Sequence, residues 1–443
     1  MNRSLHEQQN PLLSGAFYIL LVILFATFSA IFEILPVIHH LRPILVLSTL
    51  GLLAVFATGQ FVKVLATPIG VCLAAFTVWF IACIPFGLWP GGSFKVFSDM
   101  WYKAALIFVM TAALITTLPQ ARRVFHTIAY AVGFVAAIGI LLNQAKYGRL
   151  GIADTRYGNA NEFAWSLVVG LAFLGYMYLR GTHFQKIVAV ILGLVVLFAI
   201  SRTGSREGLL GVLILVVFAF RNASKATKAK LALSGTVVLA LILIVLPSAL
   251  RQRFTTFGGD YDWRDLHSQR ATARSSTEAR KELLIESLRI SAMHPLLGVG
   301  PGNFAVAQDQ LAQERGEASH WQVTHNSFTE VSAEMGVPGL AIYLTFLYQI
   351  FKQLRLILRT KTRSPAWNEI RAMAMALQAV MIAFLLIACF SSLEFNTDVP
   401  ILAGITVGLG FIAQRQRAID RATAQKTIAE PSVEAGLEPV AVG

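Results

Sequence analysis

The sequence predicts an all-α protein that crosses a membrane many times. Hydrophobic residues make up 56% of the 443 residues, charged residues make up 14%, and the mean hydropathy is +0.63. Soluble domains carry about 25% charged residues, so this composition suits a lipid environment. Apolar runs of about 20 residues, long enough to span the hydrocarbon core as helices, recur along the chain.

About twelve such runs are candidates for transmembrane helices. The first is too long for the hydrophobic region of a secretory signal and has no evident small-residue cleavage site, so we expect it to be a span. The predicted spans cover residues 12–33, 42–58, 65–85, 101–118, 124–143, 162–180, 185–201, 206–221, 229–248, 336–357, 371–392 and 398–414.

The basic residues predict which way the chain is threaded. The formal net charge is +13, and lysines and arginines gather in alternate loops, for instance at Arg122, Arg180, Lys225, Arg355 and Arg415. By the positive-inside rule these loops are cytoplasmic, which puts both termini in the cytoplasm. Because the charge is scattered and does not form one basic domain, we do not expect nucleic-acid binding.

The loop lengths divide the chain into four parts. Residues 1–248 hold nine predicted spans, and residues 336–415 hold three more. Between them, residues 249–335 form one large loop on the outer, periplasmic side. Residues 416–443 have little hydrophobic periodicity, so we expect a disordered cytoplasmic tail.

Short helices are expected inside the large outer loop. A capping-box spacing, Ser275 to Glu278, favours a helix start, and the glycine-rich stretch 298–304 (GVGPGNF) makes a turn into a second helix. Amphipathic helices of this kind lie along a membrane surface. The three expected helices run from Ser275 to about Met293, from about 303 to 315, and from His325 to Gly336.

Arginines in the outer loops are candidates for binding phosphate. The guanidinium group keeps its charge and makes paired hydrogen bonds, which suits a diphosphate leaving group. Arg206, at the start of a span, and Arg280, in the large loop, are the main candidates. The competing interpretations are a side chain that reaches to the lipid headgroups for Arg206 and a solvated helix face or an i,i+4 ion pair for Arg280.

His325 is the candidate general base. It lies at the predicted start of a helix, where the positive end of the helix dipole disfavours the imidazolium form. A neutral ring accepts a proton from a hydroxyl group. The alternative is a structural histidine that bonds to nearby carbonyl groups. Glu330 and Glu334 lie far around the helix from His325, so we expect neither to orient its ring.

Other kinds of catalytic site are not indicated. The sequence has no zinc-protease, P-loop, dinucleotide-binding or nucleophile-elbow motif, and no paired aspartates suited to Mg²⁺. Cys72, Cys83 and Cys389 all lie in apolar spans without metal-ligand spacing. We therefore expect neither a metal nor a cofactor, and arginines take the place of a metal at the diphosphate.

Four blocks give the chain a resemblance to a known family. It resembles the O-antigen ligase and polymerase family of bacterial membrane glycosyltransferases over roughly residues 150–400. The blocks are RYGNANEFA (156–164), SREGLLG (205–211), the run from Arg280 through MHPLLGVGPGNF (293–304), and HNSFTEVSAEMGVPG (325–339). Their order, spacing and shared outward placement make the resemblance fairly specific.

The resemblance implies a helical fold of the glycosyltransferase C class in the bacterial inner membrane, with a periplasmic active site. It implies a glycan donor on undecaprenyl diphosphate, a glycolipid or glycan acceptor such as lipid A-core, and metal-independent transfer with inversion at the sugar. Arg206, Arg280 and His325 match the family's two arginines and its proposed base. Further substrate-binding candidates are Asn161, Arg202 and Asn326.

Two carboxylates stand out against the family pattern. Family members often have a small residue where this chain has Glu207, and here the carboxylate is placed to pair with Arg206 or to tune it. Glu394, in the last outer loop, either faces the same cavity or is exposed to solvent.

Four activities fit these features to different degrees, and one of them is that of a relative that glycosylates proteins. The His-Asn-Ser block favours a ligase, which transfers a finished glycan to lipid A-core, over a polymerase, which joins lipid-linked repeats. A transporter or flippase fits less well because such proteins bury ionisable residues near the membrane centre and show internal repeats. Here the polar residues concentrate in one outer loop.

Overall fold

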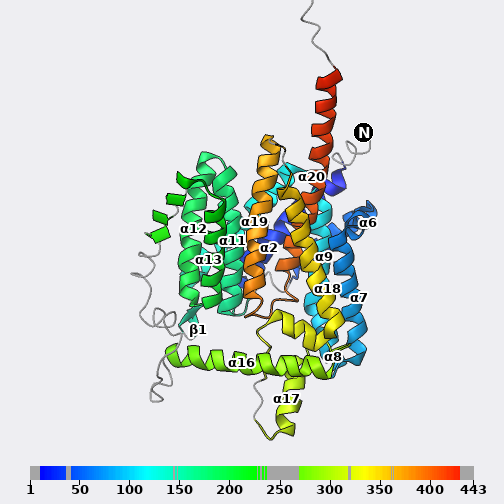
Figure 1. Cartoon of the computed structure of the whole chain (residues 1–443), viewed down its shortest axis with the longest axis vertical. Coiled ribbons are helices and arrows are strands. Elements are labelled where there is room, and N and C mark those ends of the chain that lie inside the picture. The colour runs from blue at the N-terminus through cyan, green and yellow to red at the C-terminus, as the bar shows by residue number, and fades with distance from the viewer. Residues whose placement is uncertain are drawn as a thin grey trace, which may run out of the picture.

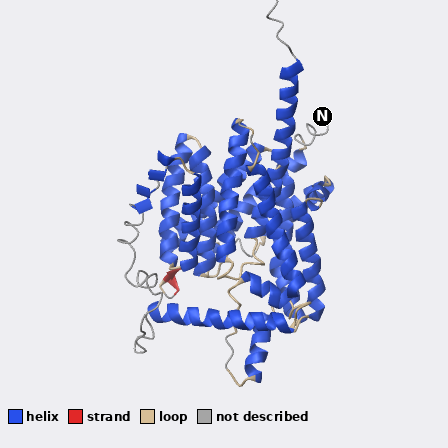
Figure 2. Ribbon diagram, viewed as in Figure 1, coloured by secondary structure: helices blue, strands red, loops and turns tan. Residues whose placement is uncertain are grey.

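The computed structural model confirms the all-α fold (Figure 2). In the described part of the chain, the strands are β1 (Ala145–Lys146) and β2 (Arg149–Leu150), which pair antiparallel. A bundle of long helices forms the body, and one helix lies across one end of it (Figure 1). The structure describes residues 10–35, 41–142, 145–146, 148–226, 228–229, 232–233, 235–236, 269–317, 321–360, 362 and 364–429.

The described helices follow the apolar runs of the sequence. The bundle contains α2 (Pro11–Ser29), α5 (Pro43–Ala57), α7 (Pro68–Cys83), α9 (Tyr102–Leu114), α10 (Leu118–Leu142), α11 (Ala160–Arg180), α12 (His183–Thr203), α13 (Arg206–Asn222), α18 (Ser327–Leu358), α19 (Pro365–Ile387) and α20 (Asp398–Ala429). Short helical segments join them: α3 (Ile31–Ile34), α6 (Gln60–Leu65), η1 (Ile84–Phe86), α8 (Pro90–Val96) and η2 (Phe97–Trp101).

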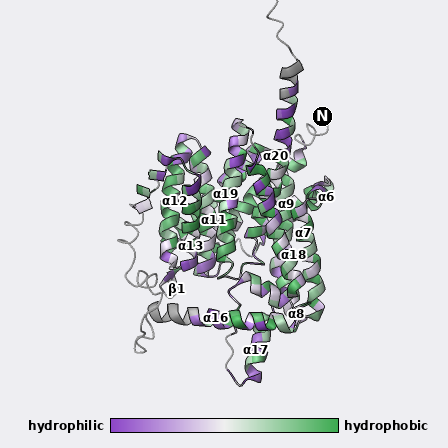
Figure 3. Cartoon of the chain, in the orientation of Figure 1, coloured by the Kyte–Doolittle hydropathy of each residue, from purple (hydrophilic) through white to green (hydrophobic). Residues whose placement is uncertain are grey.

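Within the described residues, eight helical stretches are long and apolar enough to cross a membrane, and α5 is a shorter apolar helix. Helices α13 and α20 cover two more of the predicted spans, and most of the predicted span 229–248 lies outside the described residues. Hydrophobic residues line the bundle, while the protruding end of α20 is hydrophilic (Figure 3). The chain is therefore a multi-pass membrane protein.

The last helix is longer than the sequence suggested. Helix α20 continues to Ala429, so the expected disordered tail is wrong for residues 416–429. This stretch is rich in alanine, arginine and glutamine, which favour helix without an apolar face. Residues 430–443 lie outside the described residues.

Helices α16 (Gln269–Met293) and α17 (Phe304–Glu314) lie in the large loop, close to their predicted bounds. The end of α16 at Met293 and the extent of α17 are confirmed. Helix α16 begins six residues before Ser275, so the capping-box start is wrong. A capping motif favours a helix start but does not prevent helix before it. Helix α16 runs across the end of the bundle, below α13 and α18 in the view of Figure 1.

A break at Gly336 separates the first turns of α18 from its long apolar part, as predicted. Gly336 has φ +69°, which L side chains rarely adopt. The turn after α16 packs on this break: Val299 N–H donates to Ala333 O at 2.9 Å, and Val337 N–H donates to Pro295 O at 2.8 Å. A Cβ atom at Gly336 would lie 2.1 Å from Leu296 O. The break thus ties the outer loop to the bundle.

Candidate active site

Arg280 reaches from α16 to the outer end of α13, where it pairs with Glu207. Its Nη2 atom lies 2.7 Å from Glu207 Oε1, and the two side chains are 27% and 6% exposed. The other Glu207 oxygen accepts a hydrogen bond from the Ser391 hydroxyl, in the loop that follows α19. Arg280 is therefore held in place but partly accessible. Within the described structure its Nε atom has no hydrogen-bond partner.

The short hairpin between α10 and α11 adds another arginine to this network. Arg149 Nε donates to Thr203 O at 2.8 Å, and its Nη2 donates to Asn161 Oδ1. The Asn161 amide donates in turn to Glu207 Oε1 at 3.4 Å. Sequence reasoning did not single out Arg149. Its place in an outer loop just before the Asn161 block was the available signal.

Arg206 lies beside this network, and Arg202 precedes Thr203, whose carbonyl group accepts the bond from Arg149. Arg206 is the first residue of α13, directly after the N-cap Ser205, and the charge of Arg280 acts on it. Arg202 is in the last turn of α12. The outer ends of α12 and α13 and the middle of α16 therefore bring several guanidinium groups to one place.

His325 lies just before α18, in an unusual backbone conformation. Its φ is +54°, and the next residue, Asn326, caps the helix through bonds from Phe328 N–H at 3.0 Å and Thr329 N–H at 3.2 Å. The following residue, Ser327, donates its N–H to Ala388 O at 2.8 Å. These bonds fix the start of α18 against the end of α19. The predicted place of His325, at a helix N-terminus, is confirmed.

The surroundings of His325 keep its ring uncharged. Burial and then the nearby charge of Arg280 lower the pKa of His325 to about 4. Both causes disfavour the imidazolium form. No carboxylate among the described residues pairs with the ring. At neutral pH, His325 is thus a neutral imidazole that is able to accept a proton.

The structure brings the main sequence candidates together. Arg280 acts electrostatically on both Arg206 and His325. Asn161 is linked to Arg280 through Glu207, which accepts a bond from each of them. Glu207 pairs with Arg280, so the expectation that it pairs with Arg206 is corrected. Arg280, the partner of Glu207, comes from α16, which lies far from α13 in the sequence. Asn326 uses its side-chain oxygen as a cap, so a role for it in binding substrate stays a prediction.

Three buried glutamates lie on or near the first turns of α18. Glu334 accepts bonds from Gly302 N–H at 2.7 Å and Phe304 N–H at 3.1 Å, which caps α17. Glu330 accepts a bond from the Thr324 hydroxyl at 2.8 Å. Glu394 is 5% exposed, so its solvent-exposed interpretation is wrong. Burial, then the Glu330 carboxyl, raise the pKa of Glu394 well above its usual range. Neither Glu330 nor Glu334 bonds to the His325 ring.

No group of three or more His, Cys, Asp or Glu side chains in the described residues is arranged to hold a metal ion.

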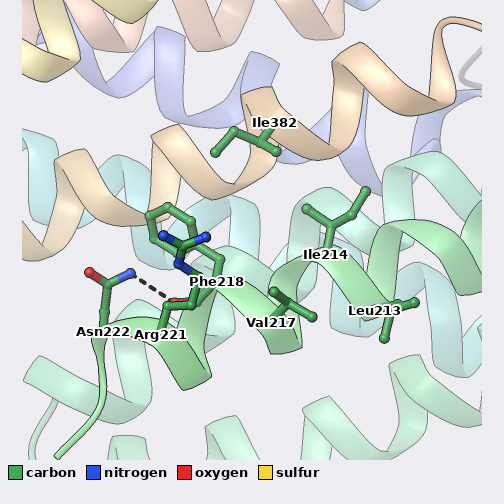
Figure 4. Close-up of a pocket in the computed structure, with 7 residues that line it drawn as sticks. All are labelled: Leu213, Ile214, Val217, Phe218, Arg221, Asn222 and Ile382. Atoms are coloured by element: carbon green, nitrogen blue, oxygen red, sulfur yellow. Dashed lines mark hydrogen bonds between the residues drawn. The ribbon is translucent and has the colours of Figure 1, made fainter.

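A groove of about 650 Å³ between α13 and α19 lies away from the candidate site (Figure 4). It runs toward the far end of α13, and no candidate site residue lines it. Its lining residues are Leu213, Ile214, Val217, Phe218, Arg221, Asn222 and Ile382.

Part of the chain that holds this site matches the model of a known protein family. Residues 187–344 match the family model described as O-antigen ligase. The chain carries an O-antigen ligase domain. The matched segment includes Arg202, Arg206, Arg280, His325 and Asn326. The resemblance to this family is confirmed over this segment, and the match supports a membrane glycosyltransferase of the ligase or polymerase type. No curated protein matches the chain.

Proposed function

We propose that this chain transfers a glycan from undecaprenyl diphosphate to a hydroxyl group of an acceptor, at the periplasmic face of the bacterial inner membrane. One observation carries the proposal. The Arg280 guanidinium acts on both Arg206 and His325, so a cationic site for diphosphate adjoins an uncharged base. These are the two groups that transfer from a diphosphate needs.

In the proposed reaction, His325 accepts the proton of the acceptor hydroxyl as its oxygen attacks the anomeric carbon. The bond from that carbon to the diphosphate oxygen breaks, and undecaprenyl diphosphate leaves with its electron pair. Direct displacement inverts the configuration at the sugar. Arg206 and Arg280 stabilise the negative charge that grows on the leaving group, and the His325 proton is then released to water.

Glu207 positions Arg280 in this scheme. An arginine held by a carboxylate at 2.7 Å has little freedom left to lose when it binds phosphate. Asn161 donates a further hydrogen bond to Glu207 and is itself held by Arg149. Arg202 and Asn326 are proposed to add contacts to the diphosphate and the glycan. Because the arginines supply the positive charge, the transfer is proposed to need no metal ion.

The acceptor is proposed to be lipid A-core or a similar glycolipid. The test is transfer by the purified chain from a defined undecaprenyl-diphosphate donor, with lipid A-core or a second donor molecule offered as acceptor. Transfer to lipid A-core supports a ligase. Chain extension on the second donor alone indicates a polymerase and contradicts the ligase assignment.

The same assay tests the metal independence. We expect EDTA to leave the rate unchanged. Loss of turnover with EDTA that Mg²⁺ restores would show that the arginines do not carry the charge alone. No transfer to either acceptor, from a donor that a known ligase uses in parallel, would contradict the proposed activity.

A further inference from the structure

A basic pocket lies at the opposite end of the bundle from the candidate active site. It has a volume of about 600 Å³ and lies between the end of α18 and the second half of α20. The stretch from Gly336 to Leu358 is roughly 33 Å long at 1.5 Å per residue, so about one bilayer thickness separates the pocket from the break. Its lining residues are Leu356, Arg359, Thr360, Thr362, Arg417, Asp420 and Arg421.

The positive charge of this pocket is not neutralised from within. Its carboxylate, Asp420, is occupied by neutral donors: Trp367 Nε1 lies 2.6 Å from one oxygen and Gln416 Nε2 lies 2.8 Å from the other. Among the described residues, no carboxylate pairs with Arg359 or Arg421. Guanidinium groups without a carboxylate partner, gathered around one pocket, favour an anion.

One of the arginines is already held in place. Arg417 Nη2 donates to Thr360 Oγ1 at 2.6 Å, and its guanidinium group lies 5.6 Å from the centroid of the Trp367 ring. A cation held in this way loses little freedom when an anion arrives. Arg359 and Arg421 are exposed on either side of the pocket.

Exposed apolar side chains lie among the residues that line the pocket or next to them in the sequence. Leu356 lines it and is 50% exposed, and Ile419, beside Asp420 on α20, is also 50% exposed. A soluble anion makes no use of such a surface, whereas an acyl chain packs on it. Basic pockets between membrane helices on the cytoplasmic side recognise the head groups of anionic lipids.

We propose that this pocket binds the phosphate head group of an anionic phospholipid in the inner leaflet, with an acyl chain along α18. The site is separate from the proposed transfer reaction and does not depend on it. Its ligand is defined by chemistry: one phosphate that the guanidinium groups contact, joined to a hydrocarbon chain.

The test measures lipid retention by the purified full-length chain, with native mass spectrometry in detergent. Phosphatidylglycerol is compared with phosphatidylcholine. In the variant Arg359→Gln/Arg421→Gln we expect phosphatidylglycerol to bind on the order of tenfold more weakly, because two head-group contacts are lost. The control Lys352→Gln/Arg355→Gln removes the same charge from exposed positions of α18 that do not line the pocket, and we expect it to bind as the unchanged chain does.

Two results would overturn the proposal. Equal weakening in both double variants would mean general attraction between a basic surface and anionic lipid. Displacement of phosphatidylglycerol by inorganic phosphate at equal concentration would mean a site for a free anion. The variant Arg359→Lys/Arg421→Lys keeps the charge but loses the guanidinium groups. Affinity for phosphatidylglycerol between that of the unchanged chain and that of Arg359→Gln/Arg421→Gln supports recognition by the guanidinium fork. It also shows that the helices still pack.

Discussion

At the scale of single residues, the site depends on one arginine that pairs with a carboxylate and acts by its charge on two other groups. Arg280 pairs with Glu207 at 2.7 Å, and its charge acts on Arg206 and His325. In the proposed mechanism it stabilises negative charge, and burial and its own charge together keep the proposed base neutral. A lysine would keep the charge but lose the paired geometry.

Replacement of the proposed base tests its role directly. We expect His325→Ala to lower the rate of glycan transfer by ~10²–10⁴-fold, the usual contribution of a general base. The measurement is the initial rate in the defined in-vitro assay, at equal protein level. The matched control is His294→Ala, an exposed histidine of the same outer loop, which we expect to leave the rate unchanged. Full activity in His325→Ala would remove the histidine from the mechanism.

The lowered pKa of His325 predicts an unusual pH profile. With a pKa of about 4, the ring is in its base form throughout the neutral range. The rate should therefore stay level from neutral pH down to about pH 5 and fall only as pH approaches 4. An ordinary histidine would lose half its base form near pH 6.5. The measurement is kcat/KM for the donor, which reports the pKa of the free enzyme, with thermal stability recorded at each pH. A midpoint near 6.5 in a stable protein would contradict the burial of His325.

At the scale of elements, the site is assembled by the ends of helices. The first turns of α18 place His325, the outer ends of α12 and α13 place the arginines, and α16 carries Arg280 across the bundle. The loop after α19 binds both Glu207 and the start of α18. A break at Gly336 lets the outer loop dock here, because only a residue without Cβ fits against Leu296 O.

The break predicts a large effect of a small substitution. We expect Gly336→Ala to destabilise the outer loop by ~2 kcal/mol or more, because a positive φ costs an alanine about 1–2 kcal/mol and the added Cβ meets a backbone carbonyl. The measurements are thermal unfolding in detergent and the rate of transfer, and both should fall. The control Gly193→Ala, on α12, adds a Cβ that meets nothing within 4 Å. Equal stability of the two variants would show that the turn after α16 does not pack tightly against the break at Gly336.

At the scale of the whole molecule, the two ends of the bundle have different chemistry. One end carries α16 and the candidate site, and the other carries the basic pocket and the protruding end of α20 (Figure 1). From the distribution of basic residues we propose that the second end is cytoplasmic. On this assignment the site opens to the periplasm.

Cysteine labelling tests that orientation. In a background without Cys72, Cys83 and Cys389, we expect His294→Cys to react with a membrane-impermeant maleimide from the periplasm. Arg421→Cys should react only after the inner membrane is opened. Both positions are exposed, so access alone decides the result. The reverse pattern would place the site in the cytoplasm and exclude a periplasmic acceptor.

The sequence by itself determined the fold class, most of the spans, the bounds of α17, the end of α16 and the break at Gly336. These depend on local properties: apolar length, helix breakers, and the need to satisfy every backbone group in lipid within a helix. It also pointed to Arg206, Arg280 and His325, because they lie in or next to the predicted outer loops and match the motifs of the family that the chain resembles.

The tertiary structure alone decided which of these groups meet. Glu207 pairs with Arg280 from α16, Arg149 joins from a hairpin, and Glu394 is buried beside Glu330. The low pKa of His325 also comes from burial and from Arg280. Which of these residues meet depends on how the helices pack across the bundle. Hydrophobic periodicity predicts where helices form but not which helices pack against each other.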